Sequence, residues 1–105
     1  MDTQTIERTT LSNLIYNENY ARKVLPFIKG KYFEVREERI IFEEISNFVD
    51  KYKKIPTQTS LEIEVGERKD LSEIEYKKVV DIIKTLNPVE VDFDWLVDHT
   101  EKFCK

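Results

Sequence analysis

The sequence predicts an all-α fold, a compact bundle of about six helices, the last of which is interrupted by the end of the chain. Helix breakers are scarce, since only 2 of the 105 residues are Gly and 3 are Pro. Glu, Lys, Ile and Leu, which suit helices, are abundant. Apolar residues recur at helical spacing along most of the chain. Together these observations favour helices throughout.

The composition indicates one domain spanning residues 1–105. The net charge is −4, with Lys and Arg interleaved among acids, whereas a nucleic-acid-binding domain usually carries a basic stripe. A single cysteine, Cys104, excludes an internal disulfide and fits a reducing cytoplasm. The first ten residues are polar, unlike a signal peptide, and no apolar run approaches the roughly 20 residues that cross a bilayer. We therefore expect a cytoplasmic domain without direct nucleic-acid or membrane binding.

Two helices are expected before the middle of the chain. The first should begin at a cap provided by Thr3 or Thr5 and run to about Tyr16. A second, short helix should begin near Asn19 and end just before Pro26. Proline lacks the amide hydrogen that an interior helical position donates, and its ring clashes with the preceding turn.

The stretch 36–54 is expected to be the central helix, because it contains neither Gly nor Pro and its apolar arc is broad. Spacings of i, i+4, i+7 and i+11 put four large apolar side chains on one face, where we expect them to be buried: Ile41, Ile45, Phe48 and Tyr52. We expect this helix to be a scaffold that also holds the last helix in place.

The fourth helix is expected over residues 58–67, with Thr57 as its N-cap. Its pattern is ambiguous, because Leu61, Ile63 and Val65 alternate with glutamates as they would in a strand. We prefer a helix, since no partner strand is visible elsewhere in the sequence.

The fifth helix has the clearest start signal in the chain. Ser72 and Glu75 have the spacing of a capping box, in which each side chain bonds the other residue's backbone amide. The helix should then run to about Leu86 and bury Val79 and Ile83 on one face.

The last helix should begin after Asp92 as N-cap, and its apolar arc is unusually wide. From Phe93 to the end of the chain there is no Gly, Asn or Pro to stop it, so we expect this helix to continue through residues 93–105 without a C-cap. Either the whole arc covers the core of this domain, or one part contacts a partner. The candidate interface residues are Trp95, Leu96, His99 and Phe103.

The sequence contains no motif for catalysis, for metal binding or for cofactor binding. The Gly-Lys pair at 30–31 has Leu25 where a phosphate-binding loop needs its first Gly, and Tyr32 where it needs Ser or Thr. Zinc sites need about four ligands, and His99 and Cys104 alone supply too few. We expect a non-catalytic chain with no bound cofactor, which acts through protein contacts.

Several short blocks, in order and spacing, resemble the N-terminal domain of DnaB-type replicative DNA helicases of T-even-like bacteriophages. The resemblance covers nearly the whole chain, and no single block is a fingerprint by itself. The blocks are Leu11-Ser12-Asn13-Leu14-Ile15-Tyr16, Val24-Leu25-Pro26-Phe27, Lys31-Tyr32-Phe33-Glu34, Ile55-Pro56-Thr57 through Leu61, Glu75-Tyr76, Asp94-Trp95-Leu96-Val97 and Thr100-Glu101-Lys102.

The resemblance implies a role in DNA replication inside the infected bacterial host cell. It implies a hexameric ring with a collar of N-terminal domains, contacts with other copies, and docking of primase and a helicase loader. It also implies that ATP and Mg²⁺ bind in a separate C-terminal motor domain. The helix from residue 93 would then be the first helix of the hairpin that pairs protomers.

The alternative is a self-contained small helical phage adaptor, a regulatory module that binds a protein partner and is unrelated to any motor. The gene beyond Lys105 discriminates between the two hypotheses, because a downstream phosphate-binding loop supports the helicase and a stop codon supports the adaptor. Salt-dependent DNA binding would instead support a DNA-binding domain, which the acidic balance disfavours.

Overall fold

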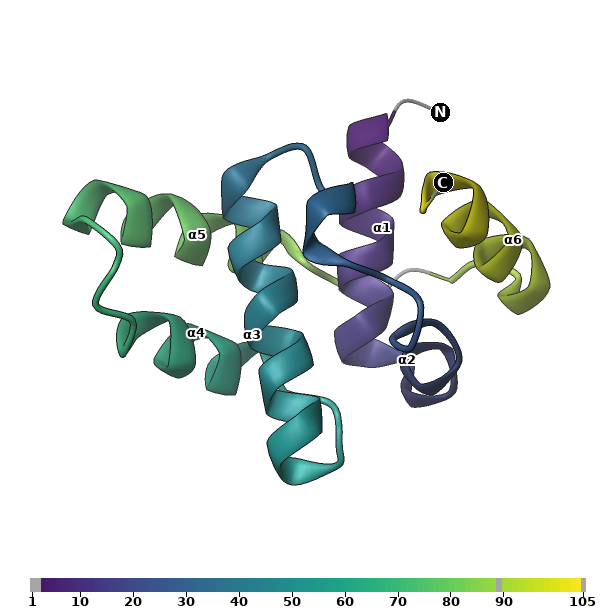
Figure 1. The fold of residues 1–105 in the computed structure, drawn as a ribbon, viewed down its shortest axis with the longest axis horizontal. Helices are drawn as coiled ribbons and strands as arrows, with labels where there is room; N and C mark the ends of the chain where they lie inside the picture. The colour runs from purple at the N-terminus through teal and green to yellow at the C-terminus, as the bar shows by residue number, and fades with distance from the viewer. Residues whose placement is uncertain (1–2, 89, 105) are drawn as a thin grey trace.

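A computed structural model describes residues 3–88 and 90–104 of the chain, with side chains from residue 6 onward (Figure 1). The expected all-α bundle of six helices is confirmed, and no strand occurs in the described part. The cap expected at Thr3 or Thr5 falls on side chains outside the described residues. The elements are α1 Thr3–Tyr16, α2 Glu18–Val24, the short 3-10 helix η1 Gly30–Tyr32, α3 Arg36–Tyr52, α4 Gln58–Gly66, α5 Glu73–Thr85 and α6 Phe93–Phe103.

The helices form two groups that meet along α1 and α3, which lie side by side in the middle of the molecule (Figure 1). On one side α4 and α5 pack against α3 and against each other. On the other side α2 and α6 pack against α1 and each other. The centre of the core is fully buried and comes from both middle helices: Leu11, Leu14, Ile41 and Ile45.

The six residues expected in the core differ in their burial. Four of them are fully buried, namely Ile41, Ile45, Val79 and Ile83. The expectation for Tyr52 is wrong, because 45% of its side chain is exposed, and Phe48 is only half-buried. Figure 1 shows the C-terminal end of α3 extending past α1 and α4, so the last turn has little to pack against. There the rings of Phe48 and Tyr52 contact each other, with centroids 4.7 Å apart.

The central helix ends two residues before the expected boundary. Lys53 adopts the left-handed conformation, with φ of 59°, and its backbone N–H donates to the carbonyl oxygen of Val49 at 2.8 Å. This is the usual way of closing a helix, although glycine is the residue that takes the position most easily. The turn leads directly into Ile55 and Pro56, and so to α4.

Capping boxes start both α4 and α5; the sequence predicted the box at Ser72 and Glu75, and at Thr57 it predicted only an N-cap. The Thr57 hydroxyl accepts from the N–H of Ser60 at 3.1 Å, and the Ser60 hydroxyl accepts from the N–H of Thr57 at 2.8 Å. Ser72 and Glu75 make the same reciprocal pair, both bonds being 3.1 Å. These bonds satisfy amides that the first turn of a helix leaves without partners.

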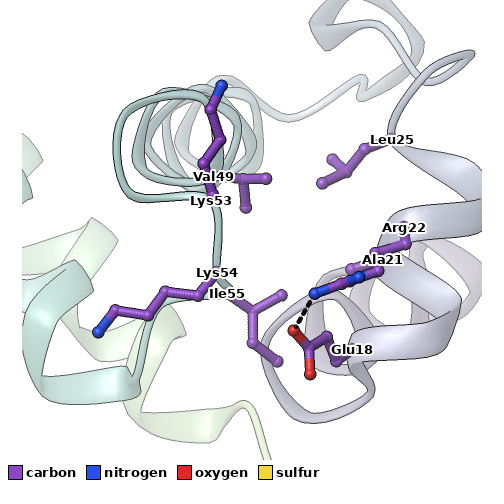
Figure 2. A pocket seen from close by; sticks show the side chains of 8 residues that line it. All are labelled: Glu18, Ala21, Arg22, Leu25, Val49, Lys53, Lys54 and Ile55. Atoms are coloured by element: carbon purple, nitrogen blue, oxygen red, sulfur yellow. Dashed lines mark hydrogen bonds and ion pairs between the residues drawn. The ribbon is translucent and has the colours of Figure 1, made fainter.

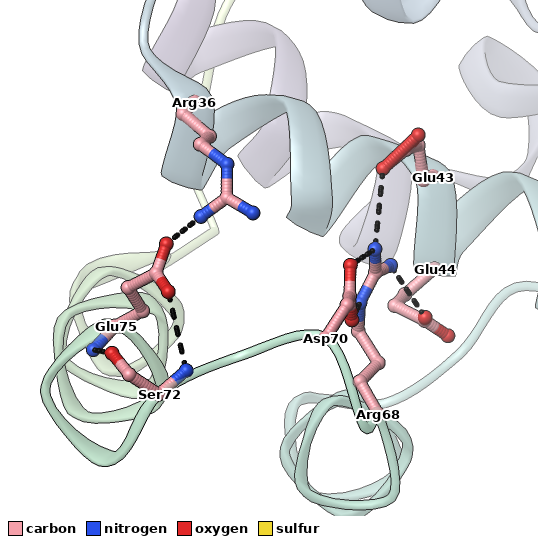
Figure 3. A network of polar contacts seen from close by, with 7 residues as sticks. All are labelled: Arg36, Glu43, Glu44, Arg68, Asp70, Ser72 and Glu75. Atoms are coloured by element: carbon pink, nitrogen blue, oxygen red, sulfur yellow. Dashed lines mark hydrogen bonds and ion pairs between the residues drawn. The ribbon is translucent and has the colours of Figure 1, made fainter.

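A polar network fixes α4 and α5 to the central helix (Figure 3). Arg68, just after α4, donates to Glu44 of α3 at 2.9 Å and to Asp70 at 2.9 Å and 3.0 Å. Arg36 at the start of α3 forms an ion pair with Glu75. Burial raises the pKa of Glu44, and Arg68 opposes that shift, while the Arg68 guanidinium lowers the pKa of exposed Asp70.

Two buried carboxylates lie between α1 and the start of α3. Glu7 accepts from the backbone N–H of Glu34 at 3.0 Å, and Arg8 Nε donates to Glu38 at 3.1 Å. Glu38 is fully buried, and its second oxygen has no hydrogen-bond partner among the residues described. Burial raises the pKa of Glu38, and the negative charge of Glu7 raises it further, although Arg8 lowers it.

A buried hydrogen bond joins α6 to α2. The hydroxyl oxygens of Tyr20 and Thr100 lie 2.6 Å apart, and the Thr100 hydroxyl donates to the carbonyl of Leu96 at 2.8 Å. Because that hydroxyl has a single proton, Tyr20 must be the donor to Thr100. Burial of its ring raises the pKa of Tyr20, which keeps this phenol protonated and able to donate.

The expectation that the central helix holds α6 in place needs correction, because α6 packs against α1 and α2. Its link to α3 runs through an intermediate ring, Phe33. The Phe103 ring of α6 meets Phe33 edge to face with centroids 5.2 Å apart, and Phe33 stacks on Phe42 of α3 at 5.3 Å. The reason is topological, since α1 lies between α3 and α6 (Figure 1).

Two aliphatic residues of α4, Leu61 and Ile63, test whether this segment is a helix or a strand. Leu61 is fully buried and Ile63 is 58% exposed, whereas a strand would put both on one face. We expect Leu61→Ala to lower the free energy of unfolding by about 2–5 kcal/mol, and Ile63→Ala to change it by less than about 0.5 kcal/mol. Urea denaturation measures both, and equal losses would contradict the helix.

The Tyr20–Thr100 bond is tested by a double-mutant cycle. Thr100→Val removes the acceptor and should cost about 1–3 kcal/mol, because the buried Tyr20 hydroxyl is left without a partner. Tyr20→Phe should cost less in that background than in the native chain, with a coupling energy of about 1 kcal/mol measured by denaturation. Tyr16→Phe is the matched control, since its hydroxyl donates to the Leu86 carbonyl instead and should be additive with Thr100→Val.

Candidate functional site

The last helix begins where the sequence predicts. The Asp92 carboxylate accepts from the N–H of Trp95 at 3.0 Å, which caps α6. The face toward α1 and α2 is buried and consists of Leu96, Val97 and Thr100. Acidic and basic side chains cover the outer face, so the helix presents apolar groups to a partner only along its flanks.

Two of the four candidate interface residues are used by the domain itself. Leu96 is only 1% exposed, so the expectation that its side chain contacts a partner is wrong for this conformation. Phe103 is half-buried, with its ring against Phe33 and, at 6.4 Å between centroids, against Tyr32. The wide arc seen in the sequence therefore mixes core positions with surface positions.

Trp95 and His99 form the remaining part of the candidate surface. Their rings stack with centroids 4.0 Å apart and planes 24° from parallel. His99 Nδ1 lies 3.1 Å from the carbonyl oxygen of Trp95, so the bond requires a proton on that nitrogen. Both side chains are half-buried, and Trp95 also packs against the edge of the core. The pair is a stacked, partly exposed aromatic surface.

A second surface feature, missed in the sequence, is a groove of about 350 Å³ beside the end of α3 (Figure 2). The side chains that line it come from α2, the last turn of α3 and the segment after it: Glu18, Ala21, Arg22, Leu25, Val49, Lys53, Lys54 and Ile55. The sequence does show Lys53 and Lys54 directly before Ile55. The opposite wall comes from α2, however, and only the tertiary fold brings it there.

The described residues contain no cluster of side chains that could hold a metal ion. Within residues 3–88 and 90–104, no three His, Cys, Asp or Glu side chains gather closely enough to hold a metal. Burial raises the pKa of Cys104 to about 11, so its thiol is protonated near neutral pH and is a poor nucleophile. No helix in this part of the chain has the length and apolar character to cross a membrane.

Comparison with known proteins agrees with the resemblance seen in the sequence. The family model of the DnaB-like helicase N terminal domain matches residues 2–93. A DnaB-like replicative helicase of Enterobacteria phage T4 is 33% identical over 95 residues, which cover 90% of this chain and 20% of that protein. The chain thus spans about one fifth of the length of this relative. On these grounds the chain belongs to the DnaB-like helicase N-terminal domain family.

Proposed function

We propose that this chain is the non-catalytic N-terminal domain of a phage replicative helicase. It serves in assembly of the ring collar and in docking replisome partners, primase and a helicase loader among them. The observation that carries the proposal is the family match over residues 2–93, supported by the replicative helicase of phage T4 as a relative. ATP and Mg²⁺ would act in a different domain, and the contribution of this chain would be a set of contact surfaces.

The packing of α6 supports a role in assembly. Its inner face is fixed to α1 and α2 by Leu96 and by the buried bond from Tyr20 to Thr100. A helix held so firmly presents the Trp95–His99 pair at a fixed angle, which reduces the entropy lost when a partner binds. In the proposed collar, residues 93–105 would be the start of the hairpin that pairs two protomers.

Self-association of the purified chain tests the Trp95–His99 surface. We expect weak, concentration-dependent association in light scattering, and we expect Trp95→Ala to reduce it. Because Trp95 is only half-buried, the substitution should cost less than the roughly 3–5 kcal/mol typical of a fully buried Trp. Ile74→Ser is the matched control, since Ile74 is 70% exposed on α5.

Two results would contradict the proposal. If the native chain stays strictly monomeric at high concentration, the proposal that the Trp95–His99 pair acts in assembly is wrong. ATP hydrolysis by the purified chain, which we expect to be absent, would contradict a non-catalytic domain. The hydrolysis assay should use the full-length helicase as its positive control.

A further inference from the structure

The groove beside α3 combines an apolar floor with a basic rim. Leu25, Val49 and Ile55 are half-buried and point toward the same hollow (Figure 2). Lys53 and Lys54 are exposed and extend outward from its edge. An apolar side chain that enters such a groove loses contact with water, and carboxylates beside it would meet the two ammonium groups.

Some of the charged side chains around the groove already form ion pairs within the chain, and others do not. Arg22 is paired with Glu18 at 2.8 Å, on the wall formed by α2. Among the residues that the structure describes, neither Lys53 nor Lys54 forms an ion pair. The groove therefore has free positive charge on one side, and it favours an acidic, apolar segment.

The solvent face of α4 has this complementary chemistry. Ile63 is 58% exposed, although it is a large aliphatic side chain in the middle of a well-capped helix. Glu67 follows one turn later and Glu62 lies on the flank, while α4 itself contains no Lys or Arg. An exposed isoleucine among glutamates complements an apolar groove beside lysines in hydrophobicity and charge.

We propose that the solvent face of α4 in one copy of the chain docks in the groove of a second copy. Ile63 would enter between Leu25, Val49 and Ile55, and Glu62 and Glu67 would face the two lysines. The inference rests on the proposed function, because it names a further surface for contact between copies of the domain. It does not involve the Trp95–His99 pair, so the two surfaces can be tested separately.

The positions of the two surfaces determine the kind of assembly. In Figure 1, α4 lies on one side of α3, and α2, which forms one wall of the groove, lies on the other. A contact between different surfaces is heterologous, and each copy then has one free groove and one free α4 face. Repetition of such a contact gives a closed ring or an open chain.

Sedimentation velocity over a concentration series tests the inference. The native chain should form species larger than a dimer at low salt and fewer of them at about 0.5 M salt, where charge interactions are screened within a few Å. Ile63→Ser and the double substitution Lys53→Glu/Lys54→Glu should each weaken association at least about tenfold. Ile74→Ser is the control and should leave it unchanged, and circular dichroism shows whether each variant is folded.

Mixing the two variants gives the decisive result. The Ile63→Ser chain keeps its groove and the Lys53→Glu/Lys54→Glu chain keeps its α4 face. In the Trp95→Ala background, which removes the proposed α6 contact, an equimolar mixture should therefore form a dimer, although each variant alone is a monomer. A mixture that stays monomeric, or a folded single variant that associates like the native chain, would overturn the inference.

The Trp95→Ala variant separates this contact from the one on α6. Association that survives Trp95→Ala but is lost with Ile63→Ser supports the groove and removes the α6 contact. Association that is lost with Trp95→Ala but survives Ile63→Ser supports the α6 contact and overturns the groove. The two variants thus show separately whether the α6 contact or the groove contact is wrong.

Discussion

The contact between α1 and α3 limits where every other helix of the domain can pack. Leu11 and Leu14 from one helix and Ile41 and Ile45 from the other are completely buried, and each such side chain contributes about 1.5–3 kcal/mol when removed from water. The other faces of these two helices are then free to bind α2 and α6 on one side and α4 and α5 on the other. Loss of this contact would separate the two groups.

The carboxyl group of Glu38 is buried at the same contact. Its burial costs stability, and its bond with Arg8 favours one arrangement of α1 and α3. The pKa of Glu38 is raised, so the folded state binds its proton more tightly than the unfolded chain does. Stability from this group therefore falls as the pH rises from the unfolded pKa through the folded one. Arg8 offsets part of that cost, and the bond it makes requires α1 and α3 to meet in one register. The opposite sign holds for Asp70, whose lowered pKa gives stability that is lost on acidification.

Local signals predicted the helices well, and tertiary placement accounts for the errors. The caps at Thr57, Ser72 and Asp92 depend on residues three positions apart, which the sequence shows directly. The burial of Tyr52 depends on how far the neighbouring helices extend beside α3, and no periodicity reports that length. The groove likewise needs α2 and the end of α3 to meet, which no local pattern predicts.

The wide apolar arc of α6 shows why burial could not be assigned within it from the sequence. Adjacent residues lie about 100° apart around a helix axis, so a rotation of α6 by that angle would bury Trp95 in place of Leu96. The bond between Tyr20 and Thr100 selects one orientation, because in any other the hydroxyl of Tyr20 would be buried without an acceptor. That penalty places Leu96 in the core and leaves the Trp95–His99 flank partly exposed. A buried polar pair thus determines which residues of this helix a partner can contact.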